Sequence, residues 1–388
     1  MENNEIEKSI ELLISYIEEE EFKGYDPYDT LNSSIPFHWF GKWGEVLSIQ
    51  IQKRNPINIR PILGIKKFSS TKGMGLLLKA YVNQFMITKN YKLVPSIEFI
   101  KDWLIANKTF YNNDFCWGYD YPYSIPQKRI KKGYPTVIHH SYIIDGLYEY
   151  YKYSNDSEIK SFIIKSSDFI INNIPLIKIG KDVCFAYNPD SKECCYNASL
   201  HAAKCLSISD KLNQSNKYVT LIEKAIDFVV SKQKENGEWY YSEDLRGNER
   251  KQIDFHQGFI LESIYDIITL LGFSTPSWQK AIAKGLNFYK EEQFYSNGQS
   301  KWRLPKIYPV DIHNQAQGII TFSKLNKQNP TFLRFAQTIA NWTIDNMQSN
   351  RGYFYYRKYR NYTNKISYMR WSQAWMLLAF TELKKNNI

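Results

Sequence analysis

The chain has 388 residues, of which 43% are hydrophobic and 16% aromatic, including 30 Tyr and 10 Trp. This composition is typical of a folded globular protein with a sizeable core. The many Tyr and Trp residues suit walls that grip sugars, or they fill the space between the helices of a large helical repeat. The net charge is +11, but the basic residues are scattered, and the one dense cluster, at 128–132, lies in a loop flanked by Gly and Pro. We therefore expect no nucleic-acid partner. The positive field instead favours an anionic glycan or a lipid-phosphate carrier at a membrane surface.

The N-terminal residues, 1–5, are acidic and polar, unlike the basic and then apolar start of a secretory signal. No apolar run approaches the ~18–20 residues that span a bilayer. The five cysteines form an odd set without an obvious disulfide framework, which fits a reducing compartment. We therefore expect a cytoplasmic protein, with peripheral membrane association left open and no indication of its oligomeric state.

Two groups of His and Cys residues lack the spacing of a metal site. His139 and His140 are adjacent, so their side chains point in different directions, and no third ligand is evident. Cys194 and Cys195 precede an expected helix that carries Cys205 and a histidine, without a familiar zinc spacing. No Gly-rich phosphate loop is present either. We therefore predict no metal site and no cofactor.

Apolar residues recur at helical spacing along most of the chain. An amphipathic helix is expected at 5–20, an accessory helix at about 36–53 with a Pro-punctuated connector to about 66, and a buried helix at 73–87. Helices with a charged face then alternate with more apolar helices, and short aromatic, strand-like turns lie between them. The charged-face helices are predicted at 94–107, 157–173, 217–233, 276–292 and 331–348, and the apolar ones at 138–152, 196–208, 254–271, 311–325 and 368–385.

Two-helix repeats of this length predict a stacked or closed helical array. Six pairs of alternating character favour an all-α (α/α)6 toroid, in which the apolar helices form an inner ring and the amphipathic helices an outer ring. An open solenoid is the alternative, but it would need polar capping repeats that the sequence lacks. We predict a single toroid domain over residues 1–388, with the accessory helix and connector at about 36–66 and short β-like aromatic turns at one end.

Polar residues mark the starts of the apolar helices and are evenly spaced along the sequence, with the same interval between each and the next: His140, Asn197, Asp254, Asp311 and Tyr368. In a toroid all inner helices begin at the same end, so these residues are expected to converge on one mouth. Asp and Asn are ordinary helix caps. Capping does not explain His256, His313 and Arg370, which each follow such a position by two residues, and we interpret these three as parts of a site.

Several motifs together resemble a family of helical-toroid proteins from surface-polysaccharide gene clusters, usually called "polysaccharide biosynthesis protein". Some members carry the name aminolevulinic acid dehydratase, which no residue here supports. The motifs are Gly24-Tyr25-Asp26-Pro27-Tyr28-Asp29, Arg60-Pro61-Ile62-Leu63-Gly64-Ile65, Trp117-Gly118-Tyr119, Tyr196-Asn197-Ala198-Ser199-Leu200, Phe255-His256-Gln257-Gly258-Phe259, Tyr308-Pro309-Val310-Asp311-Ile312-His313 and Tyr368-Met369-Arg370-Trp371-Ser372-Gln373. The resemblance implies a part in capsule, exopolysaccharide or lipopolysaccharide biosynthesis. It also implies an architecture similar to six-hairpin glycosidases, uronate lyases and glucuronyl epimerases.

The first functional hypothesis is a lyase or epimerase that acts on an anionic, uronate-containing glycan or its precursor, including a lipid-linked saccharide. Such chemistry needs a base for the C5 proton, a group that neutralises the carboxylate, and a proton donor. His256 or His313 could be the base, and Tyr368 the donor. The candidate catalytic residues are Asp311, His313, His256, Tyr368 and Arg370.

Two alternatives remain open from the sequence. A glycoside hydrolase would need two carboxyls, ~5–5.5 Å apart in a retaining enzyme or ~6.5–9.5 Å apart in an inverting one, and Asp311 with Asp26, Asp120 or Asp254 could supply them. A non-catalytic glycan-binding toroid would use its aromatic turns only to stack on sugars. The candidate substrate-binding residues are Tyr25, Asp26, Asp29, Trp117, Tyr119, Asp120, His140, Asn197, Asp254, Asn314, Trp371 and Gln373.

Overall fold

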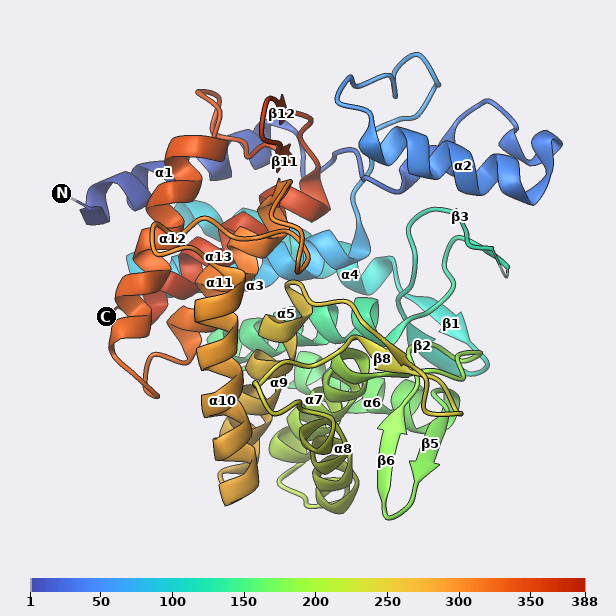
Figure 1. Ribbon diagram of the computed structural model, residues 1–388, viewed down its shortest axis with the longest axis vertical. Coiled ribbons are helices and arrows are strands. Elements are labelled where there is room, and N and C mark those ends of the chain that lie inside the picture. The colour runs from blue at the N-terminus through green and yellow to red at the C-terminus, as the bar shows by residue number, and fades with distance from the viewer. Residues whose placement is uncertain (1, 127, 388) are drawn as a thin grey trace.

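The computed structural model describes residues 2–126 and 128–387. Its centre is a closed ring of inner helices in which each helix packs against the next and the last packs against the first (Figure 1). These helices are α3 (Thr71–Thr88), α5 (Val137–Ser154), α7 (Tyr196–Asn213), α9 (His256–Leu271), α11 (Ile312–Lys324) and α13 (Trp375–Lys385). They are buried on nearly all sides over most of their length, which explains why their sequences are more apolar than those of the other helices.

A second set of helices surrounds this ring and buries only one face. They are α1 (Glu2–Glu19), α4 (Val94–Ala106), α6 (Ser157–Asn173), α8 (Val219–Ser231), α10 (Pro276–Gln293) and α12 (Thr331–Met347). In α8, for example, Ile222, Ile226 and Val229 are buried at helical spacing. Together the two rings confirm the predicted all-α (α/α)6 toroid. No helix in the described part of the chain is long and apolar enough to cross a membrane.

Glycines allow two of the inner helices to approach each other closely. A Cβ atom added at Gly146 of α5 would lie 2.4 Å from the carbonyl oxygen of Gly75 in α3. A Cβ atom added at Gly75 would in turn lie 2.9 Å from the backbone of α5. Both distances are too short for a side chain, so the contact between α3 and α5 requires glycine at both positions.

Short antiparallel strands lie in the connections between helices. They are β1 (Thr109–Tyr111), β2 (Asp114–Cys116), β3 (Tyr123–Ser124), β4 (Arg129–Ile130), β5 (Leu176–Ile179), β6 (Asp182–Phe185), β7 (Cys194–Cys195), β8 (Ser242–Glu243), β9 (Glu249–Arg250), β10 (Val310–Asp311), β11 (Arg357–Lys358) and β12 (Thr363–Asn364). The pairs β7–β8 and β10–β11 join successive repeats, because each leads from the start of one inner helix to the turn that precedes the next. These pairings hold neighbouring helix starts together at one end of the toroid.

The predicted accessory helix is α2 (Gly41–Arg54), and it lies between the first outer and the first inner helix in the sequence. The short helices η1 (Asp29–Asn32) and η2 (Phe37–Phe40) precede it, and η3 (Tyr91–Leu93) precedes α4. In Figure 1, α2 extends away from the body of the toroid at the upper right. A π-helical turn, η4 (Met369–Ala374), precedes α13.

The helix starts follow the even spacing of the polar residues only in part. Asp311 and Tyr368 are the N-cap residues of α11 and of η4. Asp254 instead precedes Phe255, the N-cap of α9. Asn197 and His140 lie inside α7 and α5. All five positions are nevertheless at the same end of the toroid.

Three glutamines form a second repeat, and all three have the same role in the structure. Gln257, Gln315 and Gln373 are also evenly spaced, at an interval one residue longer than that of the polar helix-start residues. Each side chain bonds to the backbone of the aromatic turn that precedes its helix. Gln373, for example, accepts a hydrogen bond from the backbone N–H of Phe354 at 2.8 Å and donates one to the carbonyl of Phe354 at 2.9 Å. These glutamines fix the aromatic turns to the inner ring, since an unpaired buried backbone group would be costly. We call the three residues the glutamine clamps.

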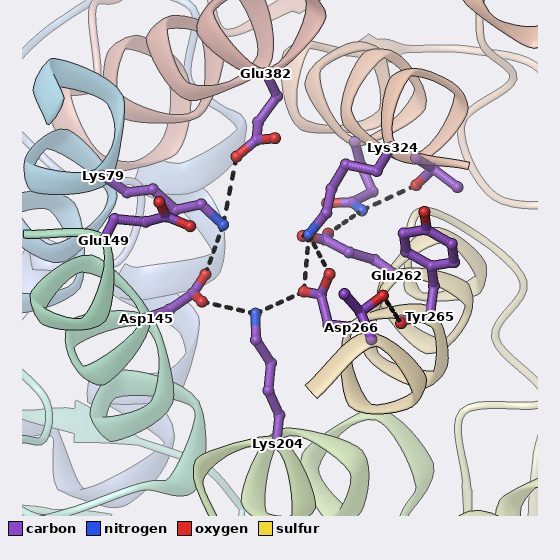
Figure 2. Close-up of polar contacts among 12 residues, drawn as sticks. Lys79, Asp145, Glu149, Lys204, Glu262, Tyr265, Asp266, Lys324 and Glu382 are labelled. Carbon is purple, nitrogen blue, oxygen red and sulfur yellow. Dashed lines mark hydrogen bonds and ion pairs between the residues drawn. The ribbon is translucent and has the colours of Figure 1, made fainter. Parts of the chain in front are cut away.

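Deeper along the inner helices, a largely buried chain of ion pairs connects the helices across the toroid (Figure 2). We call this set, which draws on every inner helix, the ion-pair chain: Glu382, Lys79, Asp145, Lys204, Asp266, Lys324 and Glu262. Its N···O distances range from 2.6 Å between Lys324 and Asp266 to 3.4 Å between Lys79 and Glu382. The sequence did not predict it.

Candidate functional site

A cavity of about 820 Å³ lies at the end of the toroid where the inner helices begin. It is lined by the first turns of the inner helices, by the aromatic turns and by the C-terminal part of α2. Its floor is aromatic: Phe259 lines the cavity, and Tyr142 and Trp375 pack against it, with ring centroids 5.1 to 6.2 Å apart.

The structure brings eight of the predicted site residues to the cavity wall. They are Tyr119, Asn197, Asp254, His256, Asp311, His313, Arg370 and Trp371. The expectation that the polar residues at the inner-helix starts converge on one mouth is therefore met by Asn197, Asp254 and Asp311. Their roles in binding or catalysis remain predictions.

Asp254 and His256 form a hydrogen-bonded pair at the wall. His256 Nδ1 lies 2.5 Å from Asp254 Oδ1. The second carboxylate oxygen accepts a hydrogen bond from Gln252 Nε2 at 2.9 Å and lies 3.4 Å from Arg303 Nε. Burial opposes the ionisation of Asp254, but the adjacent His256 and Arg303 outweigh it and lower the pKa of Asp254 below its usual value. Asp254 is therefore an ionised carboxylate that orients the imidazole.

His313 lies beside this pair but has a different environment. Its ring stacks on Phe255, with centroids 4.4 Å apart, and Phe255 also stacks on His256 at 4.4 Å. Neither ring nitrogen of His313 has a hydrogen-bond partner within the described residues. Burial lowers the pKa of His313 well below its usual value, and Lys72 and Arg370 act in the same direction. The second imidazole is therefore neutral, and both of its nitrogens are buried without a partner among the described residues.

Arg370 is held in place by a carboxylate that the sequence analysis assigned to substrate binding. Its Nε and Nη2 atoms donate to the two oxygens of Asp26 at 2.6 and 2.9 Å, and Nη2 also donates to the hydroxyl of Tyr121 at 3.2 Å. Both residues of this bidentate pair are buried. Asp26 does not line the cavity, so it positions Arg370 from behind.

Asp311 is the N-cap of α11, and its carboxylate is fully engaged. One oxygen accepts hydrogen bonds from the backbone N–H of His313 at 3.1 Å and from the indole of Trp371 at 2.9 Å. The other accepts from Arg357 Nε at 2.7 Å. The residue therefore combines the capping role with an ion pair at the cavity wall.

Several lining residues were missed by the sequence analysis. Lys72, in the first turn of α3, lies with its Nζ atom 4.4 Å from the ring centre of Tyr142 and 5.2 Å from that of Trp375, directly above the floor. Burial lowers the pKa of Lys72 well below its usual value. Burial, followed by the charge of Arg357, also lowers the pKa of Lys53 to about 7. In the sequence, the only sign that Lys72 belongs to the site is its position in an otherwise apolar helix start.

The cavity lining contains more basic than acidic side chains. Two carboxylates line the cavity, Asp254 and Asp311, and both already have cationic partners. The lining also includes seven basic side chains: Lys53, Arg54, Lys72, Arg250, Arg303, Arg357 and Arg370. Such an excess of positive charge in a recess attracts anionic molecules.

Other predicted site residues lie away from the cavity, and here the geometry corrects the sequence analysis. Trp117 is buried, and its indole donates to the carbonyl of Leu104 at 3.0 Å, where it holds the end of α4. His140 packs between Trp117 and Phe169 in the core. Tyr368, the predicted proton donor, is fully buried, and Arg60 lies over its ring at 4.8 Å. None of the three predicted residues lines the cavity.

The remaining predicted residues support the surrounding loops. Asp29 forms a buried ion pair with Arg60 at 2.8 Å. Asp120 accepts hydrogen bonds from Ser70 and Thr71 at the start of α3. Asn314 donates to the carbonyls of residues 301 and 302, and Gln373 is the clamp on Phe354 described above. Tyr25 lines a separate, smaller pocket of about 380 Å³.

The histidines and cysteines do not gather into a ligand set. Among the described residues, no three His, Cys, Asp or Glu side chains are placed to hold a metal ion together. All five cysteines are buried thiols without a disulfide. Cys195 donates to the side-chain oxygen of Asn197 at 3.1 Å, which orients that amide beside the cavity.

Comparison with known proteins identifies the fold. No family model matches the sequence, and no curated protein sequence matches it. The structure is similar to cellobiose 2-epimerase from Bacillus thermoamylovorans (TM-score 0.66, 11% identity, covering 82% of this chain and 88% of that one). It is also similar to an unsaturated glucuronyl hydrolase specific for heparin (TM-score 0.65, 8% identity, 98% and 96%). A GH76 α-mannanase from Bacteroides thetaiotaomicron gives a TM-score of 0.64 at 11% identity, covering 84% and 88%. The chain therefore has the toroid fold of the six-hairpin glycosidase-like proteins.

Proposed function

We propose that the protein is a carbohydrate-active enzyme that acts on an anionic sugar or glycan by acid/base chemistry of the lyase or epimerase type. The observation that carries this proposal is the Asp254–His256 pair at the wall of a cavity lined by seven basic side chains. The similarity in fold to a cellobiose 2-epimerase and to a glucuronyl hydrolase supports a sugar substrate, although fold alone does not determine the reaction.

His256 is assigned the role of base. A carboxylate can only accept a hydrogen bond, so in the neutral imidazole the proton lies on Nδ1 and points to Asp254. This leaves Nε2 as the acceptor for a substrate proton. When Nε2 takes the proton, the imidazolium is stabilised by the adjacent carboxylate, which makes the transfer easier.

The cations supply the second requirement of this chemistry. A proton next to a carboxylate becomes acidic only when the developing negative charge is stabilised. Arg370, which Asp26 holds in place, lies in the cavity lining and is assigned to the substrate carboxylate. His313 is assigned as the second acid/base group in place of Tyr368, since Tyr368 does not reach the cavity. Return of a proton would give the epimer, and loss of the substituent at the neighbouring carbon would give the unsaturated lyase product.

We also infer, from the motifs shared with proteins of surface-polysaccharide gene clusters, that the substrate belongs to surface glycan assembly. The saccharide could be free or linked to a lipid carrier. Composition analysis of the surface polysaccharide from a strain that lacks this protein tests this part. A missing or changed uronate residue is expected, and an unchanged polymer would contradict it.

The reaction is tested by incubating the protein with a panel of uronate-containing oligosaccharides in D2O. Mass spectrometry would detect deuterium at the carbon next to the carboxylate, and ultraviolet absorbance would detect an unsaturated product. We expect His256→Gln and Asp254→Asn to lose at least about a hundredfold of the rate, as is usual for a general base. His38→Gln, which removes an exposed imidazole outside the cavity, is the matched control.

The outcome of this assay separates the three hypotheses. Release of new reducing ends without deuterium or unsaturation would instead identify a hydrolase that uses Asp254 and Asp311, the two candidate carboxyls in the cavity lining. The ionised state of Asp254 argues against it as the proton donor that hydrolysis requires. Binding of the oligosaccharides without any conversion would identify a glycan-binding toroid.

A further inference from the structure

The accessory helix α2 exposes an unusual amount of apolar surface. Phe40, Trp43, Leu47 and Ile51 follow one another at helical spacing and are between 55% and 73% exposed. Trp39, just before the helix, is 80% exposed, and the flanking loops add Ile35, Ile57 and Ile62 to the same stretch of chain. Soluble surfaces rarely carry a contiguous patch of large apolar side chains without a binding role.

The orientation of the helix is the reverse of the usual one. The face of α2 that is buried against the protein carries Glu45 and Gln52, with Ile49 between them. Glu45 accepts a hydrogen bond from Ser124 of β3 and lies 3.3 Å from Arg129 Nε of β4. Polar contacts therefore attach α2 to the protein, and its apolar face is directed outward. Hydrophobic burial within this chain cannot explain that arrangement.

The hairpin that packs against α2 is rich in basic residues. The β3–β4 hairpin, joined to α2 through Glu45, carries the cluster Lys128, Arg129, Lys131 and Lys132, and both Lys131 and Lys132 are exposed. In residues 36–66 and 123–132 together, nine residues are Lys or Arg and one is acidic, the buried Glu45. Three of the nine have acidic partners: Arg60 is buried against Asp29, Lys128 pairs with Asp190 and Arg129 with Glu45. The structure attaches the hairpin that carries this cluster to α2 through Glu45.

We propose that α2 and the β3–β4 hairpin form a docking surface for an anionic lipid bilayer. Trp, Phe, Leu and Ile on one face of a helix, with Lys and Arg beside them, are typical of helices that lie in the membrane interface. The apolar side chains enter the boundary between headgroups and acyl chains, and the basic hairpin contacts the headgroups. This proposal does not depend on the reaction proposed above.

A second copy of the chain is the other occupant to consider. In a two-fold symmetric dimer the same patch meets itself, so the basic hairpins of both copies would lie along one small interface. Like charges placed together oppose association. An anionic bilayer instead supplies the opposite charge along with the apolar environment, and the observations therefore favour it.

The docking surface lies next to the mouth of the cavity. Gln50, Lys53 and Arg54, at the C-terminal end of α2, line the cavity, whereas Trp43 and Leu47 lie on the exposed stripe one or two turns earlier. A bilayer bound to the stripe would therefore lie beside the mouth. Saccharides carried by a membrane lipid would reach the cavity without leaving the membrane surface.

The test measures binding of the full chain to vesicles of phosphatidylcholine, with and without phosphatidylglycerol, by co-sedimentation. We expect binding to the anionic vesicles that weakens as salt is added. The variant Trp43→Gln/Leu47→Gln/Ile51→Gln keeps good helix formers in α2 and is expected to weaken binding at least about tenfold, from the loss of buried apolar area. Lys131→Gln/Lys132→Gln is expected to weaken it about fivefold per lysine, on anionic vesicles only.

Controls and contrary outcomes are specific. Met86→Gln/Tyr91→Gln removes apolar side chains that are 47% and 75% exposed at the opposite end of the toroid, and it should bind like the unchanged protein. Brominated lipids should quench part of the tryptophan fluorescence of the unchanged protein and a smaller part in the α2 variant, which lacks Trp43. No binding to phosphatidylglycerol vesicles at low salt would refute the proposal. A dimer in sedimentation velocity that the α2 variant abolishes would also overturn it and make the face an interface between copies.

Discussion

Replacing Lys204 with methionine would remove the central link of the ion-pair chain. Lys204 Nζ lies 2.9 Å from Asp145 and 2.7 Å from Asp266, and its side chain is 9% exposed (Figure 2). Methionine has a similar length, so the change removes the charge with little change in packing volume. Both aspartates would lose a partner inside the protein, where an uncompensated charge is expensive.

The magnitude follows from the partners that remain. Breaking a buried pair costs about 3–5 kcal/mol. Asp145 keeps Lys79 at 2.8 Å and Asp266 keeps Lys324 at 2.6 Å, so the lower end of that range, about 3 kcal/mol, is expected. From the usual entropy of unfolding per residue, this corresponds to a decrease in Tm of roughly 4 °C for a chain of this length.

The assay is thermal unfolding followed by circular dichroism at neutral pH. Lys92→Met, at an exposed lysine outside the ion-pair chain, is the control and should leave Tm within about 1 °C. The double variant Lys204→Met/Asp145→Asn removes one charge of each sign and should be less destabilised than the sum of the two single changes. If Lys204→Met unfolds at the same temperature as Lys92→Met, the reasoning about the ion-pair chain is wrong.

Three further predictions rest on the surroundings of single side chains. Burial and nearby arginines lower the pKa of Lys53 to about 7, so the affinity for an anionic oligosaccharide should fall as pH rises from about 6 to 8. Calorimetric titration should show that Lys53→Arg removes this pH dependence, and an unchanged dependence would contradict the assignment. Although burial opposes ionisation, Lys79 and its neighbours lower the pKa of Glu382 to about 2. The ionised Glu382 therefore stabilises the folded protein fully above the unfolded pKa of about 4.3, and this stabilisation is lost as pH falls toward 2. Glu382→Gln should flatten the decrease in Tm between about pH 5 and 2. The backbone N–H of Ser300 lies 2.7 Å from the side-chain oxygen of Gln315, and Gln315→Leu would leave it without a partner. The free energy of unfolding should fall by about 1–3 kcal/mol, and hydrogen exchange at the Ser300 amide should become faster. Unchanged exchange at this amide would show that the clamp is dispensable.

The sequence by itself determined the helices and their arrangement in two rings. The alternation of amphipathic and more apolar helices reflects two degrees of burial, and only a closed double ring provides both without exposed apolar ends. The convergence of Asn197, Asp254 and Asp311 on one cavity follows from the same topology, because all inner helices begin at one end. These features depend on patterns along the chain and need no knowledge of side-chain contacts.

The tertiary structure decided which side chains reach the cavity. Trp117, His140 and Tyr368 belong to recognisable motifs but are directed into the core, whereas Lys72 lies above the cavity floor. A shift of one residue in a helix start turns a side chain by about 100°, and the packing of neighbouring turns sets that shift. The sequence pattern does not show this shift, since the residue types and their spacing are the same whether or not the helix start is shifted.

The two histidines show this most clearly. The even spacing of the polar helix-start residues makes His256 and His313 equivalent in the sequence, since each follows such a residue by two positions. The interval between the glutamine clamps is one residue longer, and in that register His313 corresponds to Phe255, because each lies two positions before a clamp. The structure accordingly stacks His313 on Phe255 at 4.4 Å and pairs His256 with Asp254. The sequence determined that two imidazoles approach one cavity, and the hydrogen bonds between helices and turns decided that one is paired with a carboxylate and the other is not.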